Sequence, residues 1–156
     1  MALPDGMTSC AMCVQYNTAT GTATWIDASD ALSVVEPPSQ ARMTGEAYVF
    51  GEDVAVTGVG KREPVEVTVR GVFAEGSTTA HPFYQIYAQF TTACGGPFAV
   101  RWAPASCTTD HEVFSTNTVD SEVVSVTFPA GEAGSADPIM FEAVIRSRDI
   151  TRAVWS

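Results

Sequence analysis

A mainly β fold is what the sequence predicts, in the form of an antiparallel β-sandwich or barrel-like domain with one amphipathic helix. The 156 residues include 19 valines and 18 threonines but only 2 leucines. β-branched residues favour the pleated surface of a sheet, whereas helical proteins use leucine freely. The 12 glycines and 9 prolines supply turns between short strands. The length fits a single domain overall.

Composition and charge argue against several classes of protein. Hydrophobic residues make up 46% of the chain, which is enough for a core and excludes a disordered chain. The apolar runs are too short to cross a bilayer, and the first ten residues lack a signal-peptide pattern, so we expect no membrane partner. The formal net charge of −10 would repel nucleic acid from most of the surface.

The N-terminal part of the chain carries weak signals. Residues 1–24 show no strong periodicity and are predicted to form an extended arm or a weak strand. We expect the Thr/Ala-rich residues 8–24 to bury no face of their own. Two prolines within residues 36–39 predict a rigid loop. We therefore divide the chain into an N-terminal arm and loop, residues 1–44, and a β domain, residues 45–156.

A hairpin and a long strand are the first strong elements. The apolar residues 47–50 and 54–57 flank Gly51-Glu52-Asp53, a pattern typical of a hairpin. In residues 65–73 valines alternate with polar residues, which indicates a strand with one face in the core. The polar residues on the opposite face are Glu66, Thr68 and Arg70. Within this strand Gly71 predicts a bulge or a close backbone approach.

One helix is predicted over residues 82–94. Pro82 suits the first helical position, and His81 is expected to be a capping or loop residue. Apolar side chains recur at positions i, i+3, i+4 and i+7 and form one stripe, which we expect to be buried. They are Phe83, Ile86, Tyr87 and Phe90. Gly95 and Gly96 would end the helix.

The rest of the chain predicts more strands and no catalytic site. The expected strands cover residues 98–102, 119–128, 138–145 and 150–155. Gly58-Val59-Gly60 begins like a dinucleotide-binding loop, but Pro64 prevents a helix from opening there. Asp110-His111-Glu112 places a histidine between two carboxylates. A catalytic or metal site would need these side chains to converge, but neighbouring residues on a strand point to opposite faces. We therefore interpret the segment as a solvated loop. We expect no cofactor, no metal and no enzymatic activity.

The four cysteines leave three chemical states open. Cys10 and Cys13 form a C-x-x-C pair, whereas Cys94 and Cys107 are separated by a predicted strand and its loop. The two pairs together could bind zinc, but the second pair lacks the usual ligand spacing. The alternatives are at least one disulfide, or free thiols. We favour free thiols because nothing in the sequence indicates an oxidising compartment.

Residues 60–76, GKREPVEVTVRGVFAEG, resemble the signature of the tail-tube (major tail) proteins of long-tailed bacteriophages. The pattern is a Gly-Lys-Arg-x-Pro turn, a long alternating strand and a Glu-Gly corner. In this family an amphipathic helix follows, here from His81, and then an Arg-Trp strand, here within residues 100–104. A closing strand ending in an Ile-Thr turn matches residues 142–152. The resemblance covers about residues 45–152 and extends to contractile-tail inner tubes and type VI secretion tubes, which share the fold.

The resemblance implies a structural virion protein of the phage tail, assembled in the host cytoplasm. It would polymerise with copies of itself as stacked hexameric rings, contact tape-measure and other tail proteins, and let double-stranded DNA pass without tight binding. The loop that bridges stacked rings in this family is expected at residues 27–46 or 103–120. We expect a net negative channel, since a wall that repels phosphate lets DNA slide. The candidates that face the channel or a neighbouring subunit are Glu66, Thr68, Arg70 and Glu122.

Two other functions are compatible with the sequence. One is another virion component, such as a head–tail joining, tail-terminator or head decoration protein. The other is a carbohydrate-binding β-sandwich, in which Trp25, Trp102 and Trp155 would form a platform, although aromatic residues of a β domain more often lie in a core or an interface.

Overall fold

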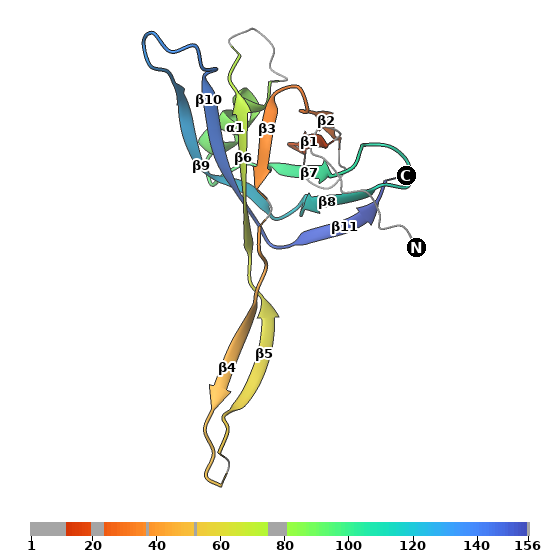
Figure 1. Cartoon of the computed structure of the whole chain (residues 1–156), viewed down its shortest axis with the longest axis vertical. Coiled ribbons are helices and arrows are strands. Elements are labelled where there is room, and N and C mark those ends of the chain that lie inside the picture. Colours follow the sequence, from red (N-terminus) through yellow and green to blue (C-terminus); the bar gives the residue numbers. More distant parts are fainter. Residues whose placement is uncertain (1–11, 20–23, 37, 52, 75–80, 156) are drawn as a thin grey trace.

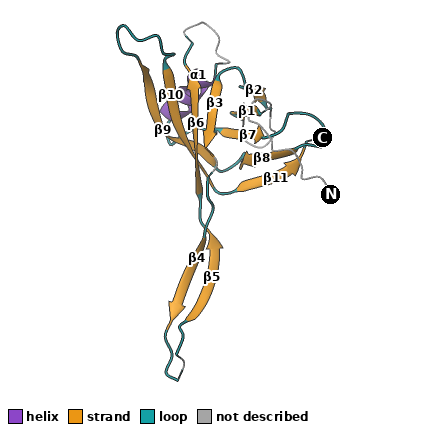
Figure 2. Cartoon of the chain, in the orientation of Figure 1, coloured by secondary structure: helices purple, strands orange, loops and turns teal. Residues whose placement is uncertain are grey.

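The computed structural model of the chain describes residues 12–19, 24–36, 38–51, 53–74 and 81–155. Strands dominate these residues, and they contain a single helix (Figure 2). The prediction of a mainly β fold with one helix is therefore confirmed. Cys10 and most of residues 1–24 lie outside the described residues.

Antiparallel strands form two sheets and one hairpin (Figure 1). Sheet A has the order β11-β8-β7-β1-β2, and sheet B has the order β3-β6-β10-β9. The strands of sheet A are β1 Cys13–Asn17, β2 Ile26–Asp27, β7 Ala99–Ala103, β8 Glu112–Thr116 and β11 Ile150–Val154. Those of sheet B are β3 Leu32–Glu36, β6 Val65–Val72, β9 Ser121–Ala130 and β10 Met140–Ser147. The helix α1 spans Pro82–Thr91, and the hairpin consists of β4 Arg42–Ala47 and β5 Val56–Arg62.

The strand β6 is central to sheet B and follows its predicted pattern. Val65, Val67 and Val69 are buried, whereas the polar residues between them point away from the core. Gly71 continues the buried series and lies in close contact with its surroundings. A Cβ atom there would lie 2.7 Å from the carbonyl oxygen of Ala31 and 2.7 Å from the ring of Phe141. The predicted close approach at Gly71 is confirmed.

The core joins the two sheets and the helix into one body. Tyr16 of sheet A stacks on Phe98, with ring centroids 5.6 Å apart. Phe141 of sheet B contacts Phe83 of α1, with centroids 5.4 Å apart. These side chains belong to one continuous hydrophobic cluster. We call sheets A and B with α1 the body of the molecule.

The strand β1 corrects one expectation about the N-terminal segment. It lies inside sheet A, between β2 and β7, and buries Val14 and Tyr16. The expectation that residues 8–24 bury no face of their own is therefore wrong for Cys13–Asn17. Only five residues form this strand, too few for a clear periodic signal between Thr- and Ala-rich flanks. Pairing with β7 stabilises it, and this pairing involves a distant part of the chain.

The helix α1 begins as predicted and ends earlier than residue 94. The side chain of His81 caps it, because its Nδ1 accepts a hydrogen bond from the backbone N–H of Phe83 at 3.2 Å. At the other end, the hydroxyl of Thr92 donates to the carbonyl of Ala88 at 2.8 Å, and Thr92 itself is extended. Cys94 and Gly95 then have positive φ angles, which reverse the chain.

The apolar stripe of α1 is buried only in part. Phe83 and Ile86 lie in the core, but Tyr87 is 43% exposed and Phe90 is 40% exposed. The prediction that all four residues are buried is therefore wrong for these two. The reason is that α1 packs beside β9, an edge strand of sheet B, which covers only part of the stripe. Tyr87 instead lies against the exposed ring of Phe128, with centroids 5.9 Å apart.

A disulfide links Cys13 of β1 to Cys107 in the loop between β7 and β8. The expectation of free thiols is wrong for these two cysteines, although the sequence left a disulfide open. The pairing arises because Cys13 lies opposite Ala103, so the chain that leaves β7 passes near it. Cys94 is free and exposed. Among the described residues there is no group of three potential metal ligands, and no helix is long and apolar enough to span a membrane.

Candidate assembly surfaces

The hairpin of β4 and β5 projects from the body as a long, narrow arm (Figure 1). Both of its strands are exposed along their whole length. A hairpin around Gly51 was predicted, and its position is confirmed, but it is longer than expected because pairing extends from Ala47–Val56 down to Arg42–Arg62. The projecting hairpin covers residues 42–62, so it shares residues 42–46 with the first range expected for the ring-bridging loop, 27–46, and lies outside the second, 103–120.

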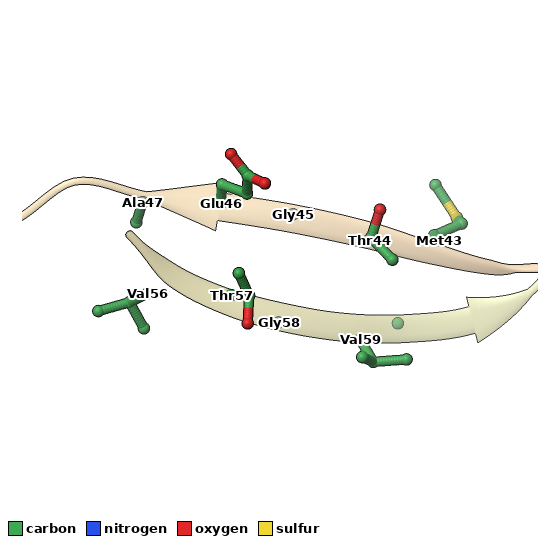
Figure 3. Close-up of a pocket in the computed structure, with 10 residues that line it drawn as sticks. Met43, Thr44, Gly45, Glu46, Ala47, Val56, Thr57, Gly58 and Val59 are labelled. Carbon is green, nitrogen blue, oxygen red and sulfur yellow. The ribbon is translucent and has the colours of Figure 1, made fainter. Parts of the chain in front are cut away.

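Large apolar side chains cover the hairpin although none of them is buried. On the strands these are Met43, Val56 and Val59, and near the tip they are Tyr48, Phe50 and Val54. Figure 3 shows the first three standing clear of the ribbon. An open groove follows the two strands and is lined by residues 43–47 and 56–60. The register places Val56 and Val59 on opposite faces of the hairpin, so apolar side chains are exposed on both faces. Exposed large apolar side chains gathered on one element in this way favour an interaction site.

A pair of glycines occupies the middle of the hairpin. Gly45 and Gly58 lie directly opposite each other, and neither has a positive φ angle. A Cβ atom added to either residue would find no atom within 4 Å. Nothing described within the subunit therefore requires glycine at these positions. Glycine inside a strand often marks the close approach of another backbone or a ligand.

The second surface is the outer face of sheet B, which points away from the core. All four candidate residues predicted from the sequence lie on it. Glu66 and Glu122 flank Arg146 of β10, because both are register partners of that residue. Thr68 lies opposite Val144. The structure thus brings residues from β6 and β9 onto one continuous face.

Charged side chains on this outer face form a network that the sequence did not reveal. The guanidinium of Arg70 contacts Glu142 through Nε at 2.5 Å and Glu36 through NH1 at 2.9 Å. The hydrogen bond to Glu142 and the charges of both carboxylates raise the pKa of Arg70 above its ordinary value. The only sequence signal for these partners was alternation within the strands. The outer face has a net charge of −2 (2 − 4). Its charged residues are the arginines Arg70 and Arg146 and the glutamates Glu36, Glu66, Glu122 and Glu142.

Sheet B also has open edges. In the described part of the chain, the outer edge of β3 pairs with no strand. The outer edge of β9 forms only an isolated bridge, between Glu122 and Pro97. Unpaired strand edges present rows of N–H and C=O groups that can pair with another chain. The two edges lie at opposite ends of the sheet.

The chain was compared with known proteins at the level of sequence and of structure. No protein-family model matches the sequence, and no curated protein matches it. Solved structures do match. The sheath/tube terminator of an extracellular contractile injection system, PVC, in its extended state superposes with a TM-score of 0.74 at 14% identity. That match covers 98% of this chain and 100% of the terminator chain.

Two further structures agree. A chain of the PVC sheath–tube complex in the extended state gives a TM-score of 0.71 at 13% identity, covering 96% of this chain and 92% of that one. A tail chain of an empty gene transfer agent particle gives 0.61 at 12% identity, covering 97% and 100%. This chain has the tail-tube fold. These superpositions confirm the resemblance to tail-tube proteins at the level of the fold. At 12–14% identity they show the fold alone.

Within this tail-tube fold the tryptophans do not form a common platform. Trp102 is buried and stacks near Phe114, with ring centroids 6.2 Å apart. Trp25 and Trp155 instead enclose the guanidinium of Arg101, whose Cζ lies 4.5 Å and 4.1 Å from their ring centroids. Burial lowers the pKa of Arg101 below its ordinary value. This arrangement fastens the end of the chain to sheet A and leaves no row of tryptophans for a sugar.

Proposed function

We propose that the chain is a structural, non-enzymatic subunit of a tail tube and polymerises as stacked hexameric rings. The observation that carries this proposal is the projecting hairpin, whose apolar side chains have no partner in the described subunit. Burying them against another molecule would remove apolar surface from water. We propose that this other molecule is a copy of the chain in the next ring. The fold supports this choice, because similar chains occur in sheath–tube and tail assemblies.

Lateral contacts would close the ring. The open edge of β3 in one subunit would pair with the open edge of β9 in its neighbour, so that sheet B continues around the ring. A closed cyclic ring leaves no free edge, and head-to-tail stacking of such rings gives a filament. Six subunits are supported by the gene transfer agent tail, a related fold whose structure has C6 symmetry.

The outer face of sheet B would then line the channel. Glu66, Thr68, Arg70 and Glu122 would face the lumen, and a ring of six would carry about −12 on this wall (6 × −2). A negative wall keeps its counterions, so passing double-stranded DNA gains nothing by binding to it. Charges act on the DNA only within about 8 Å at physiological salt. In this function the subunit would belong to the virion tail, assemble in the host cytoplasm and also contact tape-measure and other tail proteins.

The decisive experiment adds side chains at Gly45 and Gly58. The isolated chain has space for them, whereas a neighbouring copy docked on the hairpin would occupy that space. In the variant Gly45→Val/Gly58→Val, the monomer should fold with an unchanged melting temperature, because no atom lies within 4 Å of either new Cβ. The same variant should form no tubes in negative-stain images or in sedimentation. The companion variant Thr57→Ile adds bulk to the opposite face of the hairpin, where the register places Thr57 with Glu46. Comparing the two variants shows which face of the hairpin carries the contact.

Two results would contradict the proposal. One is a wild-type protein that stays monomeric at high concentration. The other is a glycine variant whose tubes match those of the wild type in length and mass. The channel is tested separately by a reconstruction of the tube, in which the calculated potential of the wall should be negative. A basic wall, or a lumen filled with side chains, would rule out the DNA conduit even if filaments form.

A tail terminator is the second candidate, favoured by the match to the PVC sheath/tube terminator along the whole of that chain. A terminator forms one ring that stops polymerisation. Images of the purified protein would then show single rings at every concentration, and no tubes. The hairpin would still be required, because that ring must attach to the last ring of the tube.

A further inference from the structure

The hairpin is joined to sheet B through a break in the strand pairing. β3 leads into β4 and β5 leads into β6, yet the hairpin forms a separate two-stranded sheet. Pro64 has no backbone N–H to donate to a ladder, and Pro38 lies on the facing segment. The break is bridged by Glu63 N–H donating to the Ala41 carbonyl at 2.9 Å and by Gln40 donating to the Glu63 carbonyl at 3.0 Å. Both bonds join the two connecting segments to each other, and neither joins the hairpin to the body.

One ion pair among the described residues connects the hairpin to the body. NH2 of Arg62, at the base of β5, lies 3.5 Å from Oδ2 of Asp149. Asp149 belongs to the short turn between β10 of sheet B and β11 of sheet A. It is the more sheltered partner, with a side chain that is 23% exposed against 51% for Arg62.

Hydrogen bonds within the body position Asp149 independently of Arg62. Its Oδ1 accepts a hydrogen bond from the side-chain amide of Asn117 at 3.4 Å. Its carbonyl accepts one from the hydroxyl of Ser147 at 2.8 Å. That hydroxyl is buried and also accepts a bond from the backbone N–H of Asn117. The carboxylate is therefore a fixed point at the corner where the two sheets meet.

We propose that Arg62 and Asp149 form a latch that sets the direction in which the hairpin leaves the subunit. The inference rests on the proposed stacking function, in which the hairpin must reach the next ring. About 12 residues separate Arg62 from the tip, so the arm extends roughly 40 Å at 3.3 Å per residue. A rotation of 10° at the base moves the tip by about 7 Å on that lever, which is more than the spacing between two paired strands.

A weak latch is sufficient because the rings engage six hairpins at once. An exposed ion pair contributes little to the stability of a monomer. Suppose that losing the ion pair halves the fraction of time that each hairpin points in the direction needed for docking. If the six hairpins of a ring are independent, the probability that all six are correctly directed falls by about 60-fold (2⁶), and the addition of a ring weakens by the same factor. Arg62 and Asp149 are thus positioning residues for assembly and not residues of the docking surface.

The first test measures the direction of the hairpin in the monomer. Spin labels are placed on the free, exposed Cys94 of the body and on Thr57→Cys of the hairpin, in a full-length Cys10→Ser background. We expect one narrow distance distribution for the wild-type latch and for Arg62→Lys, which keeps the charge. Arg62→Gln and Asp149→Asn should broaden or shift the distribution. The matched control is Arg148→Gln, which removes a neighbouring ion pair, Arg148–Asp120, with the same 3.5 Å distance.

The second test measures assembly of the full chain. Arg62→Gln and Asp149→Asn should raise the protein concentration needed for tube formation at least tenfold, while the melting temperature stays within about 3 °C. Arg62→Lys should restore assembly, and Arg148→Gln should assemble like the wild type. An unchanged distance distribution in Arg62→Gln would overturn the latch, as would normal assembly of that variant. If the wild type forms no tubes, the stacking function fails, and the distance measurement still decides whether the latch exists.

Discussion

Val67 and Val59 are eight residues apart on consecutive strands, β6 and β5, yet their surroundings are opposite. Val67 is fully buried in the core, and Val59 is 71% exposed on the hairpin. Both segments contain β-branched residues, and both are paired antiparallel with a neighbour. The difference is that β6 belongs to a sheet with a covered face, whereas the hairpin is a bare two-stranded ribbon. An isolated two-stranded hairpin is marginally stable at best in water.

The contrast between the two regions teaches that, in the proposed tube, folding and assembly depend on separate parts of the chain. The body contains the described hydrophobic core and closes it within one subunit. The hairpin adds apolar surface that the subunit alone leaves in water. Changes to the body should therefore act on the stability of the monomer, and changes to the hairpin should act on assembly.

The largest effect is expected for Phe83→Ala in the body. The ring of Phe83 contacts both Phe73 and Phe141, with centroids 5.2 Å and 5.4 Å away. Its removal should lower the free energy of unfolding by about 3–5 kcal/mol, because a cavity replaces a buried ring. Val59→Ala on the hairpin should change it by less than about 0.5 kcal/mol. Chemical denaturation of both variants measures the difference, and an equal loss in the two would contradict the division.

The disulfide between Cys13 and Cys107 is expected to have the next largest effect. It closes a loop with a sequence separation of 94 residues, so it restricts the unfolded chain. Cys13→Ser/Cys107→Ser should lower the free energy of unfolding by about 2–4 kcal/mol. The matched control is Cys94→Ser, which removes an exposed free thiol and should leave stability unchanged. A double variant as stable as the wild type under oxidising conditions would show that the bond does not form.

A smaller effect concerns pH and the pair Glu112–Arg152, which lies at the β8–β11 edge of sheet A. The hydrogen bond from Arg152 and its positive charge hold the pKa of Glu112 below its ordinary value. As the pH falls, the Glu112 carboxylate is therefore protonated at a lower pH in the folded state than in the unfolded state. The pair with Arg152 thus stabilises the fold above the ordinary glutamate pKa of about 4.3. That stabilisation is lost as the pH falls through the lower folded pKa. In Glu112→Gln and in Arg152→Gln, melting curves at several pH values should lack this part of the acid dependence.

The smallest effect on the monomer is expected from removing the hairpin itself. Residues 43–60 would be replaced by a two-residue Asn-Gly turn that connects Arg42 to Lys61. The body should keep its melting temperature within about 2 °C, because no side chain described in the removed segment is buried. Assembly should be lost completely. A shortened protein that unfolds would mean that the hairpin contributes to the body.

Sequence reasoning succeeded where one face of an element is buried and where the signal is local. The alternation in β6, the His81 cap and the close approach at Gly71 were all predicted, because each depends on a few neighbouring residues. The true length of the hairpin was missed. Its first strand reads Arg-Met-Thr-Gly-Glu-Ala and is exposed on both faces, so it shows no alternation to detect.

Contacts between distant residues were beyond reach for a different reason. Arg70 meets Glu36 and Glu142 across paired strands, Arg62 meets Asp149 in a turn of the body, and Cys13 meets Cys107 in a loop. All of these contacts depend on the tertiary arrangement, which no local pattern encodes. The outer face of sheet B was anticipated in part, because alternation in β6 and β9 places residues on a face. Which charges neutralise one another on that face depends on the register between strands.

The position of the disulfide in the chain has one more consequence. Cys13 precedes the hairpin and Cys107 follows it, so the exposed tip around Phe50 lies within the covalent ring that the bond closes. Exposed tips of this kind are where proteases cut. A subunit nicked there would yield two fragments on a reducing gel and a single band of unchanged mass on a non-reducing gel. The N-terminal fragment would keep β1 and β3 in their sheets, tied to the rest by the bond, so a clipped subunit would stay in one piece.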